Sequence, residues 1–181
     1  MPESNRLKRD YEPRGIPNPP PATNLRILTN SRFRVNLLYL AQNLGRGMEQ
    51  IAVVAAVIVR DGKILVAKKR SDQGRFTAGK WEFPGGKIEG NESHVDALIR
   101  EIGEELRLQI EVKRHLATTS HLYDGKITIQ LFVYLCKPTS DLEVLEHETV
   151  EWVTPAELYS LDLSPADAKA VPAIVEAVRD L

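Results

Sequence analysis

The stretch that decides the fold is WEFPGGKIEGNESHVDALIREIGEELRL, residues 81–108. A short strand-like segment leads through two adjacent glycines into a helix predicted over residues 92–106. At about 100° per residue, Glu101, Glu104 and Glu105 share one sector of that helix. Like charges three and four residues apart repel each other, and the helix dipole disfavours anions near the carboxyl end. This crowding of carboxylates therefore indicates a bound cation.

The chemistry of these side chains favours one kind of ion. Hard carboxylate oxygens suit Mg²⁺ or Mn²⁺ better than zinc. A magnesium ion held by few carboxylates keeps waters and takes phosphate oxygens as further ligands. The adjacent Gly85 and Gly86 would let backbone atoms approach such an ion or phosphate closely. A solvated acidic helix face is the alternative interpretation of the same glutamates.

The opposite side of the helix is expected to be core. The apolar residues that fall within about 60° of one direction are Val95, Leu98, Ile99, Ile102 and Leu106. His94 and Ala97 fall on the acidic side. We therefore expect the first group to pack against a sheet.

β-Branched and alternating segments predict strands on both sides of this stretch. The Asp61-Gly62 turn joins a buried strand to a hairpin partner. Short helices are expected to begin at Thr154-Pro155 and at Ser164-Pro165, each with a hydroxyl cap and a proline in the first turn. The predicted strands cover residues 51–60, 63–69, 81–83, 110–123, 126–136 and 150–153.

The bulk properties exclude several classes of protein. The chain has 181 residues, enough for one domain and a tail, and 43% of them are apolar. A net charge of −1 gives no electrostatic reason to expect a nucleic-acid polymer or a membrane as partner. No apolar run approaches the ~18 residues of a membrane span. The single cysteine, Cys136, allows no intrachain disulfide and is expected in the core, and a reducing, cytoplasmic location fits.

The beginning of the chain differs in composition from the rest. Six of the eleven prolines fall in the first 21 residues. We predict that residues 1–47 are a disordered or partly helical extension and that residues 48–181 form the domain. Between Pro13 and Met48 there are five arginines and no acidic residue, so a transit sequence is an alternative. A third possibility is that Met48 is the native start.

The helix and its glycines resemble the Nudix box, G-x5-E-x7-R-E-U-x-E-E-x-G-U, where U is aliphatic. The matching positions are Gly86, Glu92, Arg100, Glu101, Ile102, Glu104, Glu105 and Leu108. Arg107 stands where the box has glycine, and positive φ at an arginine costs about 1 kcal/mol. The resemblance covers residues 51–178 and is closest to the MutT-type and CTP pyrophosphohydrolase-type branch. It implies an α/β (α+β) fold, with a mixed β-sheet sandwiched between α-helices.

The resemblance also implies an activity. Family enzymes of this branch use Mg²⁺, with Mn²⁺ as a possible substitute, to hydrolyse a nucleoside triphosphate to the monophosphate and pyrophosphate. The substrate would be a small nucleotide, either CTP-like or oxidised such as 8-oxo-dGTP, in nucleotide-pool sanitation and DNA repair. A monomer or homodimer is expected. The alternatives are hydrolysis of a dinucleoside polyphosphate or ADP-ribose, and a nucleotide sensor without catalysis, although all the box glutamates are present.

By the same resemblance, roles pass to particular residues. Glu101, Glu104 and Glu105 would hold the metal, together with the carbonyl of Gly86 or its neighbour Gly85. Arg100 would orient the glutamates, and Glu92 would anchor the preceding loop. Glu146 is the candidate general base, with Glu148 or a purely solvated loop as the alternatives. The four histidines, His94, His115, His121 and His147, are expected at the surface.

The substrate-binding residues implied by the resemblance are Phe83, Pro84, Gly85, Gly86, Lys87, Lys69 and Asp167. Phe83 would line a base pocket, with core packing as the alternative. Lys69 would reach phosphates, or be simply solvated. Asp167 would read the base, with a role in starting its helix as the alternative. Because an ionised aspartate only accepts hydrogen bonds, it would recognise an amine or ring N–H of cytosine, guanine or 8-oxoguanine.

Overall fold

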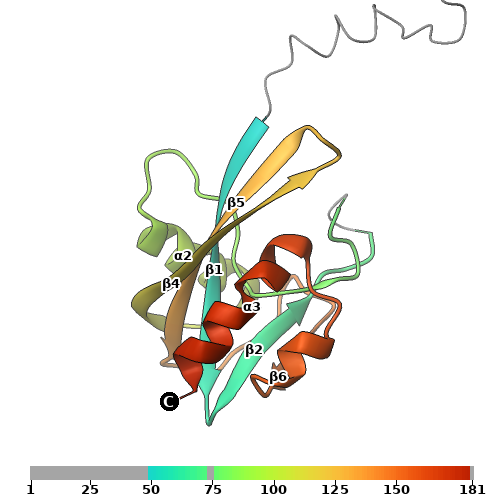
Figure 1. Ribbon diagram of the computed structural model, residues 1–181. Coiled ribbons are helices and arrows are strands. Elements are labelled where there is room, and N and C mark those ends of the chain that lie inside the picture. Colours follow the sequence, from blue (N-terminus) through green and yellow to red (C-terminus); the bar gives the residue numbers. More distant parts are fainter. Residues whose placement is uncertain (1–48, 73–75, 180–181) are drawn as a thin grey trace, which may run out of the picture. The chain divides into compact units, whose positions relative to one another are not determined.

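The computed structural model describes residues 49–72 and 76–179 (Figure 1). Its elements in chain order are β1 (Glu49–Arg60), β2 (Lys63–Lys68), β3 (Trp81–Glu82), α2 (His94–Leu106), β4 (Ile110–Tyr123), β5 (Ile127–Pro138), β6 (Thr149–Val153), the 3₁₀ helix η1 (Glu157–Ser160) and α3 (Pro165–Val178). The predicted strands and the helix expected over residues 92–106 are confirmed, with ends shifted by a few residues. A helix does follow Ser164, but it was expected to be short and extends for 14 residues. The predictions for residues 1–47 lie outside the described residues. None of the helices within the described ranges is long and apolar enough to span a bilayer.

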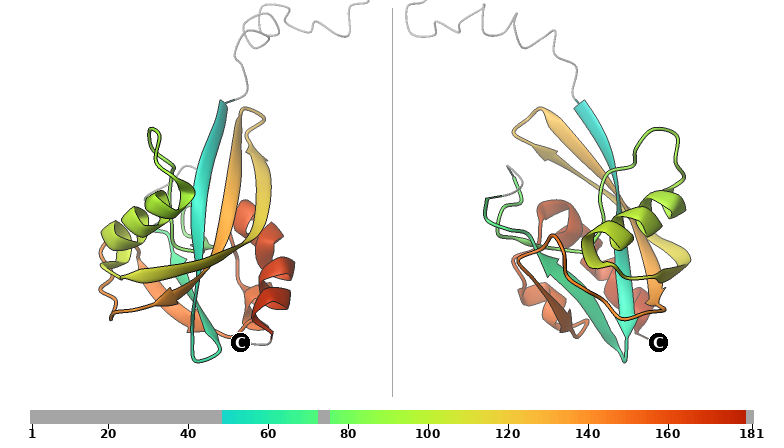
Figure 2. Two further views of the ribbon diagram at one scale, coloured as in Figure 1. Left: turned by 90° about the vertical axis from the view of Figure 1, so that its left-hand side faces the viewer. Right: turned by 180° about the vertical axis from the view of Figure 1, so that it is seen from behind.

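The six strands form one mixed sheet in the order β3-β2-β1-β5-β4, with β6 paired to β2. Strands β1 and β5 run parallel over ten residue pairs, from Glu49↔Ile127 to Ile58↔Cys136. The other pairings are antiparallel, including the hairpins β1–β2 and β4–β5. Helices α2 and α3 lie on opposite sides of the sheet (Figure 2). The expected fold, a mixed sheet between helices, is therefore confirmed.

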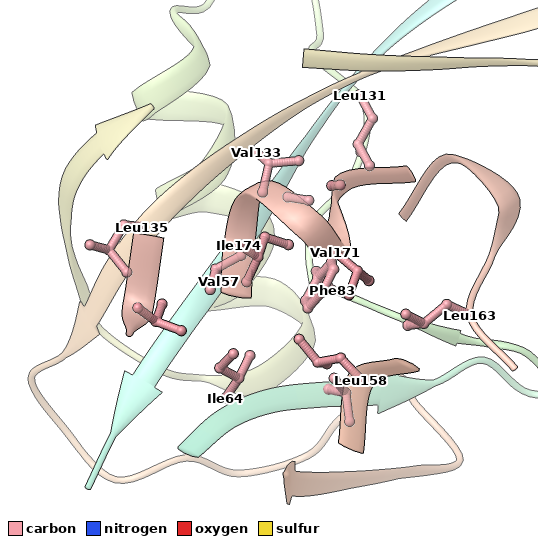
Figure 3. Close-up of a cluster of buried hydrophobic side chains, with 14 of the residues drawn as sticks. Val57, Ile64, Phe83, Leu131, Val133, Leu135, Leu158, Leu163, Val171 and Ile174 are labelled. Atoms are coloured by element: carbon pink, nitrogen blue, oxygen red, sulfur yellow. The ribbon is translucent and has the colours of Figure 1, made fainter. Parts of the chain in front are cut away.

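Strand β1 forms the centre of two hydrophobic cores because successive side chains point to opposite faces. Val54, Ala56 and Ile58 pack with α2. Ala55 and Val57 pack in the cluster that contains α3, which also includes Ile64, Phe83, Leu131, Val133, Leu135, Leu158, Leu163, Val171 and Ile174 (Figure 3). A strand buried on both faces must be apolar at almost every position, as this one is.

The predicted core face of α2 is partly wrong. Leu98, Ile102 and Leu106 are buried as expected, but Val95 and Ile99 are 40% and 47% exposed. Ala97, which was placed on the acidic side, is fully buried instead. The helix is therefore rotated toward the stripe that carries Ala97 and the glutamates four and eight residues later. The small alanine side chain permits this close approach.

The glycine pair is held against the edge of β1. The backbone N–H of Val54 donates to the Gly86 carbonyl at 2.9 Å, and that of Ala56 donates to Pro84 at 2.8 Å. Gly85 has φ 146°, and a Cβ there would lie 2.2 Å from the Val54 carbonyl oxygen. Only glycine fits this position. The segment that enters α2 is thus fixed directly beside the central strand.

The helix starts differ in detail from the predicted hydroxyl caps. Ser93 caps α2 by accepting a hydrogen bond from the Asp96 N–H at 3.1 Å. Ser164 precedes α3, but its hydroxyl donates to the Asp167 carboxylate and caps no backbone group. After Thr154 the chain forms the single 3₁₀ turn η1. At the other end of α2, Arg107 has φ 44°, which is the left-handed backbone expected from its place in the box.

Candidate active site

Two glutamates of α2 face the glycine pair. A Cβ on Gly86 would lie 2.3 Å from the Glu101 carboxyl carbon, so the carboxylate rests directly on the glycine backbone. Glu105 Oε2 accepts a hydrogen bond from the Gly85 N–H at 3.1 Å. The same rotation of α2 that buries Ala97 aims these two side chains at the segment beside β1. The carboxylates of Glu101 and Glu105 thereby form one cluster beside the glycine pair, and this cluster is called the carboxylate cluster below.

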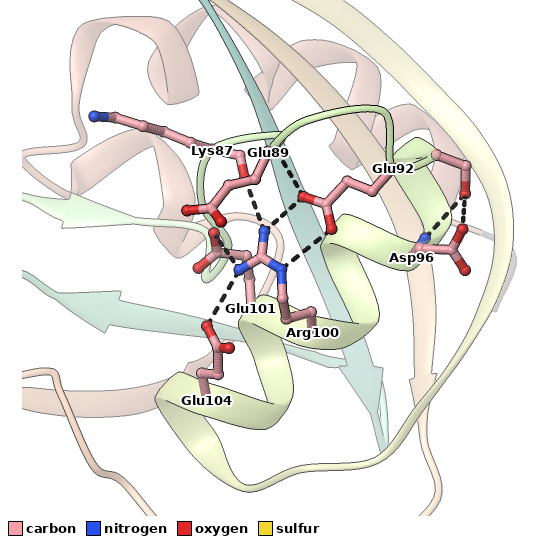
Figure 4. Close-up of polar contacts among 8 residues, drawn as sticks. Lys87, Glu89, Glu92, Asp96, Arg100, Glu101 and Glu104 are labelled. Carbon is pink, nitrogen blue, oxygen red and sulfur yellow. Dashed lines mark hydrogen bonds and ion pairs between the residues drawn. The ribbon is translucent and has the colours of Figure 1, made fainter.

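Arg100 lies at the centre of an ion-pair network beside this cluster (Figure 4). Its guanidinium contacts Glu92 at 2.7 Å, Glu101 at 3.0 Å and Glu104 at 3.2 Å. It also donates to the Lys87 carbonyl at 3.0 Å. The pKa of Glu92 is lowered, chiefly by the hydrogen bond from Arg100. One planar cation with five N–H donors thus ties the loop before α2 to two of the box glutamates.

Burial makes negative charge costly at the two facing glutamates. Burial raises the pKa of Glu105 to about 7, partly opposed by the nearby His147. The pKa of Glu101 is also raised by burial, while Arg100 acts in the opposite direction. Repulsion from Glu82 and Glu101 adds to the shift of Glu105, and repulsion from Glu104 and Glu89 adds to that of Glu101. The site therefore has more negative charge than Arg100 neutralises, and a cation would stabilise it.

The donor set fits a hard divalent ion. Glu101 and Glu105 offer carboxylate oxygens next to the glycine backbone, and Glu104 lies one turn away at the surface. Among residues 49–72 and 76–179, no three acidic, histidine or cysteine side chains converge on a ready-made site. A hard divalent ion held by one or two carboxylates completes its coordination with water and phosphate oxygens. The residues therefore suit an ion that is completed by its substrate.

A cavity of about 350 Å³ adjoins this cluster. Its lining includes Lys69, Phe76, Glu82, Phe83, Gly85, Gly86, Lys87, Tyr123 and Asp167. The rings of Phe76 and Tyr123 lie 5.2 Å apart at one wall. Phe83 is also part of the core under α3, which is the alternative considered for it. The volume is in the range of a small-ligand site, and the two glycines are shared between the cavity and the carboxylate cluster.

Asp167 lies at the inner wall of the cavity and is 5% exposed. Its Oδ1 accepts from the Phe83 N–H at 3.0 Å, and its Oδ2 accepts from the Ser164 hydroxyl. Burial raises the pKa of this carboxyl to about 7, and the two hydrogen bonds act in the opposite direction. Asp167 therefore both lines the cavity and fixes the start of α3 against the segment that follows β3.

The other predicted residues are distributed unevenly around the site. Lys69 lines the cavity and pairs with Glu82 at 3.2 Å. Glu146 is exposed on the loop between β5 and β6 and does not line the cavity. Glu148, the alternative base, pairs with Lys68 at 3.1 Å. The structure thus brings Lys69 to the cavity and leaves the two loop glutamates outside it.

Two site residues were missed or misplaced from the sequence. Glu82 had no predicted role, although it stands two residues before Pro84 in the stretch that decides the fold. His147 was expected at the surface, and that expectation is wrong because the residue is only 7% exposed. It lies between Glu82 and Glu105, at 3.4 Å and 4.0 Å from their carboxylate oxygens. The sequence around His147 gave no signal of this burial, because Glu146 and Glu148 on either side are typical of an exposed loop.

A second hollow, of about 460 Å³, lies at the opposite end of β1. It is lined by residues such as Arg60, Lys113 and Lys137. Cys136 also lines it but is buried, as expected for a core residue, and burial raises the pKa of its thiol to about 12. Neither the glycine pair nor a box glutamate borders this hollow, so it is separate from the candidate active site.

A family model described as the NUDIX domain matches residues 48–174 of the chain. The chain belongs to the Nudix family. Members of this family generally use a divalent metal ion, in agreement with the donor set around Gly86. The Nudix box of this chain therefore comprises Gly86, the loop that follows it and helix α2.

This Nudix chain is similar to several named proteins. The CTP pyrophosphohydrolase of Escherichia coli K12 is 38% identical over 130 residues, which cover 71% of this chain and 93% of that protein. The putative 8-oxo-dGTP diphosphatase 2 of Mycobacterium tuberculosis H37Rv is 37% identical over 122 residues, 64% of this chain and 81% of the relative. The solution structure of the E. coli ORF135 protein matches with a TM-score of 0.64 at 36% identity, covering 74% and 93% of the two chains.

Proposed function

We propose that this chain is a Mg²⁺-dependent nucleoside triphosphate pyrophosphohydrolase, for which Mn²⁺ can replace Mg²⁺. One observation carries the proposal: Gly85 and Gly86 border both the carboxylate cluster of α2 and the cavity. A nucleoside in the cavity would therefore direct its phosphates toward the carboxylates. The named relatives, a CTP pyrophosphohydrolase and a putative 8-oxo-dGTP diphosphatase, support the same class of substrate.

The reaction breaks one phosphoric anhydride bond by addition of water, and it yields a nucleoside monophosphate and pyrophosphate. A bound divalent ion would neutralise phosphate charge and lower the pKa of a water. Glu101, Glu105 and the Gly86 carbonyl would hold that ion, with Glu104 as a further ligand. Arg100 keeps Glu101 and Glu104 in place through its ion pairs. Each of these residues acts by position and charge.

We propose that Glu146 is the general base, which accepts the proton of the attacking water. It is exposed and lies on the loop next to His147. That loop is bonded to the end of α2, because the Leu145 N–H donates to the Glu105 carbonyl at 2.9 Å. The base would thus stand one residue from a backbone contact with a metal-binding glutamate. Glu148 is less suited to this role because it already pairs with Lys68.

The cavity favours a base that presents hydrogen-bond donors. Two residues with carboxylate side chains, Glu82 and Asp167, line it. Cytosine presents an exocyclic amine, and guanine and 8-oxoguanine present an amine and ring N–H groups. Lys69 and Lys87 at the lining would balance phosphate charge. The substrate is therefore a cytidine triphosphate or an oxidised guanosine triphosphate. Its hydrolysis would serve to clean the cytoplasmic nucleotide pool.

A product assay tests this function. The purified chain is incubated with CTP, dCTP, dGTP, 8-oxo-dGTP, ADP-ribose and diadenosine tetraphosphate, in Mg²⁺ and in EDTA, and the products are separated by anion exchange. Equal release of monophosphate and pyrophosphate from a triphosphate, in Mg²⁺ only, is the expected result. A higher kcat/KM for ADP-ribose or the dinucleotide would identify another Nudix hydrolase. Binding without turnover would identify a sensor. Glu176→Gln, at an exposed acid on α3, is the control for loss of one carboxylate.

A further inference from the structure

His147 is buried at a place that no catalytic role explains. Its side chain is 4% exposed, on the loop between β5 and β6. The backbone is pinned on both sides: the Leu145 N–H donates to Glu105 and the Glu148 N–H donates to Lys68, each at 2.9 Å. The ring is therefore held between the end of α2 and the end of β2. Burying an imidazole requires partners for its nitrogen atoms.

Two carboxylates face the same ring nitrogen and compete as acceptors for one N–H group. Nε2 lies 3.4 Å from Glu82 Oε1 and 4.0 Å from Glu105 Oε2. Ionised carboxylates only accept, so the nitrogen that faces them must carry the hydrogen. Both distances exceed the 2.7–3.2 Å or so of a well-formed N–H···O bond. Nδ1 is buried and has no hydrogen-bond partner in the part of the chain that the structure describes. The ring orientation is therefore governed by the two carboxylates.

The two acceptors belong to different parts of the site. Glu82 lines the cavity and also pairs with Lys69. Glu105 accepts from Gly85 on the side of the carboxylate cluster. A ligand in the cavity that engages Glu82 would leave the Nε2–H free to bond Glu105. A hydrogen bond to a metal-binding carboxylate orients it and strengthens metal binding.

We propose that His147 is a positioning residue that couples Glu82 to Glu105, so that a nucleobase bound at Glu82 tightens cation binding at Glu105. This inference rests on the proposed function, which places the base in the cavity and the cation on α2. Because linkage is reciprocal, the cation tightens nucleoside binding by the same factor. The enzyme would thereby bind its ion most tightly when the correct base is present.

The test uses a ligand that lacks phosphate. The dissociation constant of Mn²⁺ for the full chain is measured by electron paramagnetic resonance, with and without cytidine, and in a parallel series with 8-oxo-2′-deoxyguanosine. A nucleoside offers no phosphate to the ion, so any change passes through the protein. We expect the preferred nucleoside to lower the Mn²⁺ dissociation constant by about fivefold or more. A Mn²⁺ dissociation constant that stays unchanged at every nucleoside concentration up to the solubility limit would overturn the proposal.

Three variants separate coupling from simple structural support. His147→Gln keeps an N–H near the position of Nε2 and should retain the nucleoside effect. His147→Leu fills the space without a hydrogen-bond donor and should abolish the effect, so that its Mn²⁺ dissociation constant is the same with and without nucleoside. In Glu82→Ala the Nε2–H is committed to Glu105, so Mn²⁺ should bind as tightly as it does to the nucleoside-saturated wild type. Loss of a nearby negative charge alone predicts the opposite, weaker binding.

The results also distinguish this inference from the proposed function. An effect of equal size in wild type and His147→Leu, or weaker Mn²⁺ binding by Glu82→Ala, overturns the coupling. The Glu82→Ala arm decides the matter even if His147→Leu does not fold. A wild type that releases pyrophosphate but shows no nucleoside effect leaves the function standing without the coupling. A wild type that binds no Mn²⁺ overturns both.

Discussion

Replacing Glu105 by glutamine should stabilise the metal-free protein while removing most of its activity. The side chain is 12% exposed, and burial raises its pKa from 4.5 to about 7. At pH 8 this difference corresponds to a cost of up to roughly 3 kcal/mol for holding the carboxylate ionised. Glutamine has the same size and no charge, and its carbonyl oxygen can still accept from the Gly85 N–H. We expect a gain of about 1–3 kcal/mol, or roughly 3–10 °C in Tm.

The pH dependence gives the sign of this effect independently. The Glu105 carboxyl titrates near 4.5 in the unfolded chain and near 7 in the folded protein. Its contribution to stability is therefore fully present below pH 4.5 and is lost as the pH rises through 7. The Tm difference between Glu105→Gln and wild type should be near zero at pH 4.5 and greatest at pH 8. Asp167 titrates in the same range but is present in both proteins.

Calorimetry in EDTA from pH 4.5 to 8 measures the stability, and pyrophosphate release in Mg²⁺ measures the activity. We expect kcat to fall by at least ~100-fold, comparable to the loss of a major electrostatic stabiliser. Glu176→Gln is the matched control because it removes an exposed carboxylate, which should change neither quantity. A Glu105→Gln protein that is no more stable than wild type at pH 8, or equally active, would refute the reasoning.

Four further changes, at three places in the chain, test other features of the protein. Asp167→Ala leaves the Phe83 N–H unpaired and should lower the stability measured by calorimetry by about 1–3 kcal/mol. Asp167→Asn should lower the stability less, but it should alter the ratio of kcat/KM for CTP to kcat/KM for 8-oxo-dGTP. An unchanged ratio would mean that Asp167 has only its structural contacts. Arg107→Gly relieves a positive φ worth about 1 kcal/mol but loses an exposed ion pair with Glu143, so Tm should rise slightly or stay constant, and a clear fall would show that the ion pair dominates. A chain beginning at Met48 should fold and keep full kcat/KM, whereas an insoluble or inactive product would mean that the domain needs earlier residues.

The box spacing predicted α2 and the position of its glutamates because helical periodicity depends only on local geometry. The side of α2 that would be buried did not follow from the apolar residues. Val95 and Ile99 are as hydrophobic as Leu98, yet they stay at the rim because Glu101 must reach Gly86. The functional contact determines the rotation of the helix. That contact depends on a segment held against β1, which no helical pattern shows.

The sequence also could not place residues that meet only through the sheet. Glu82 and His147 are 65 positions apart in the chain, and they come together because β2 pairs with β3 on one side and with β6 on the other. The loop between β5 and β6 looked polar and exposed because Glu146 and Glu148 flank the histidine. Burial of His147 follows from backbone bonds to α2 and β2, which are long-range contacts.

The direction of α3 has a practical consequence for instruments that need the protein attached to a surface. Asp167 in its first turn borders the cavity, and the helix extends for 14 residues, about 20 Å, away from that point. Strand β1, in contrast, begins at Glu49, only four residues before Val53 in the cavity lining. A fluorescent dye or biosensor tether belongs at the carboxyl end of α3, where it leaves the mouth of the cavity open to nucleotides.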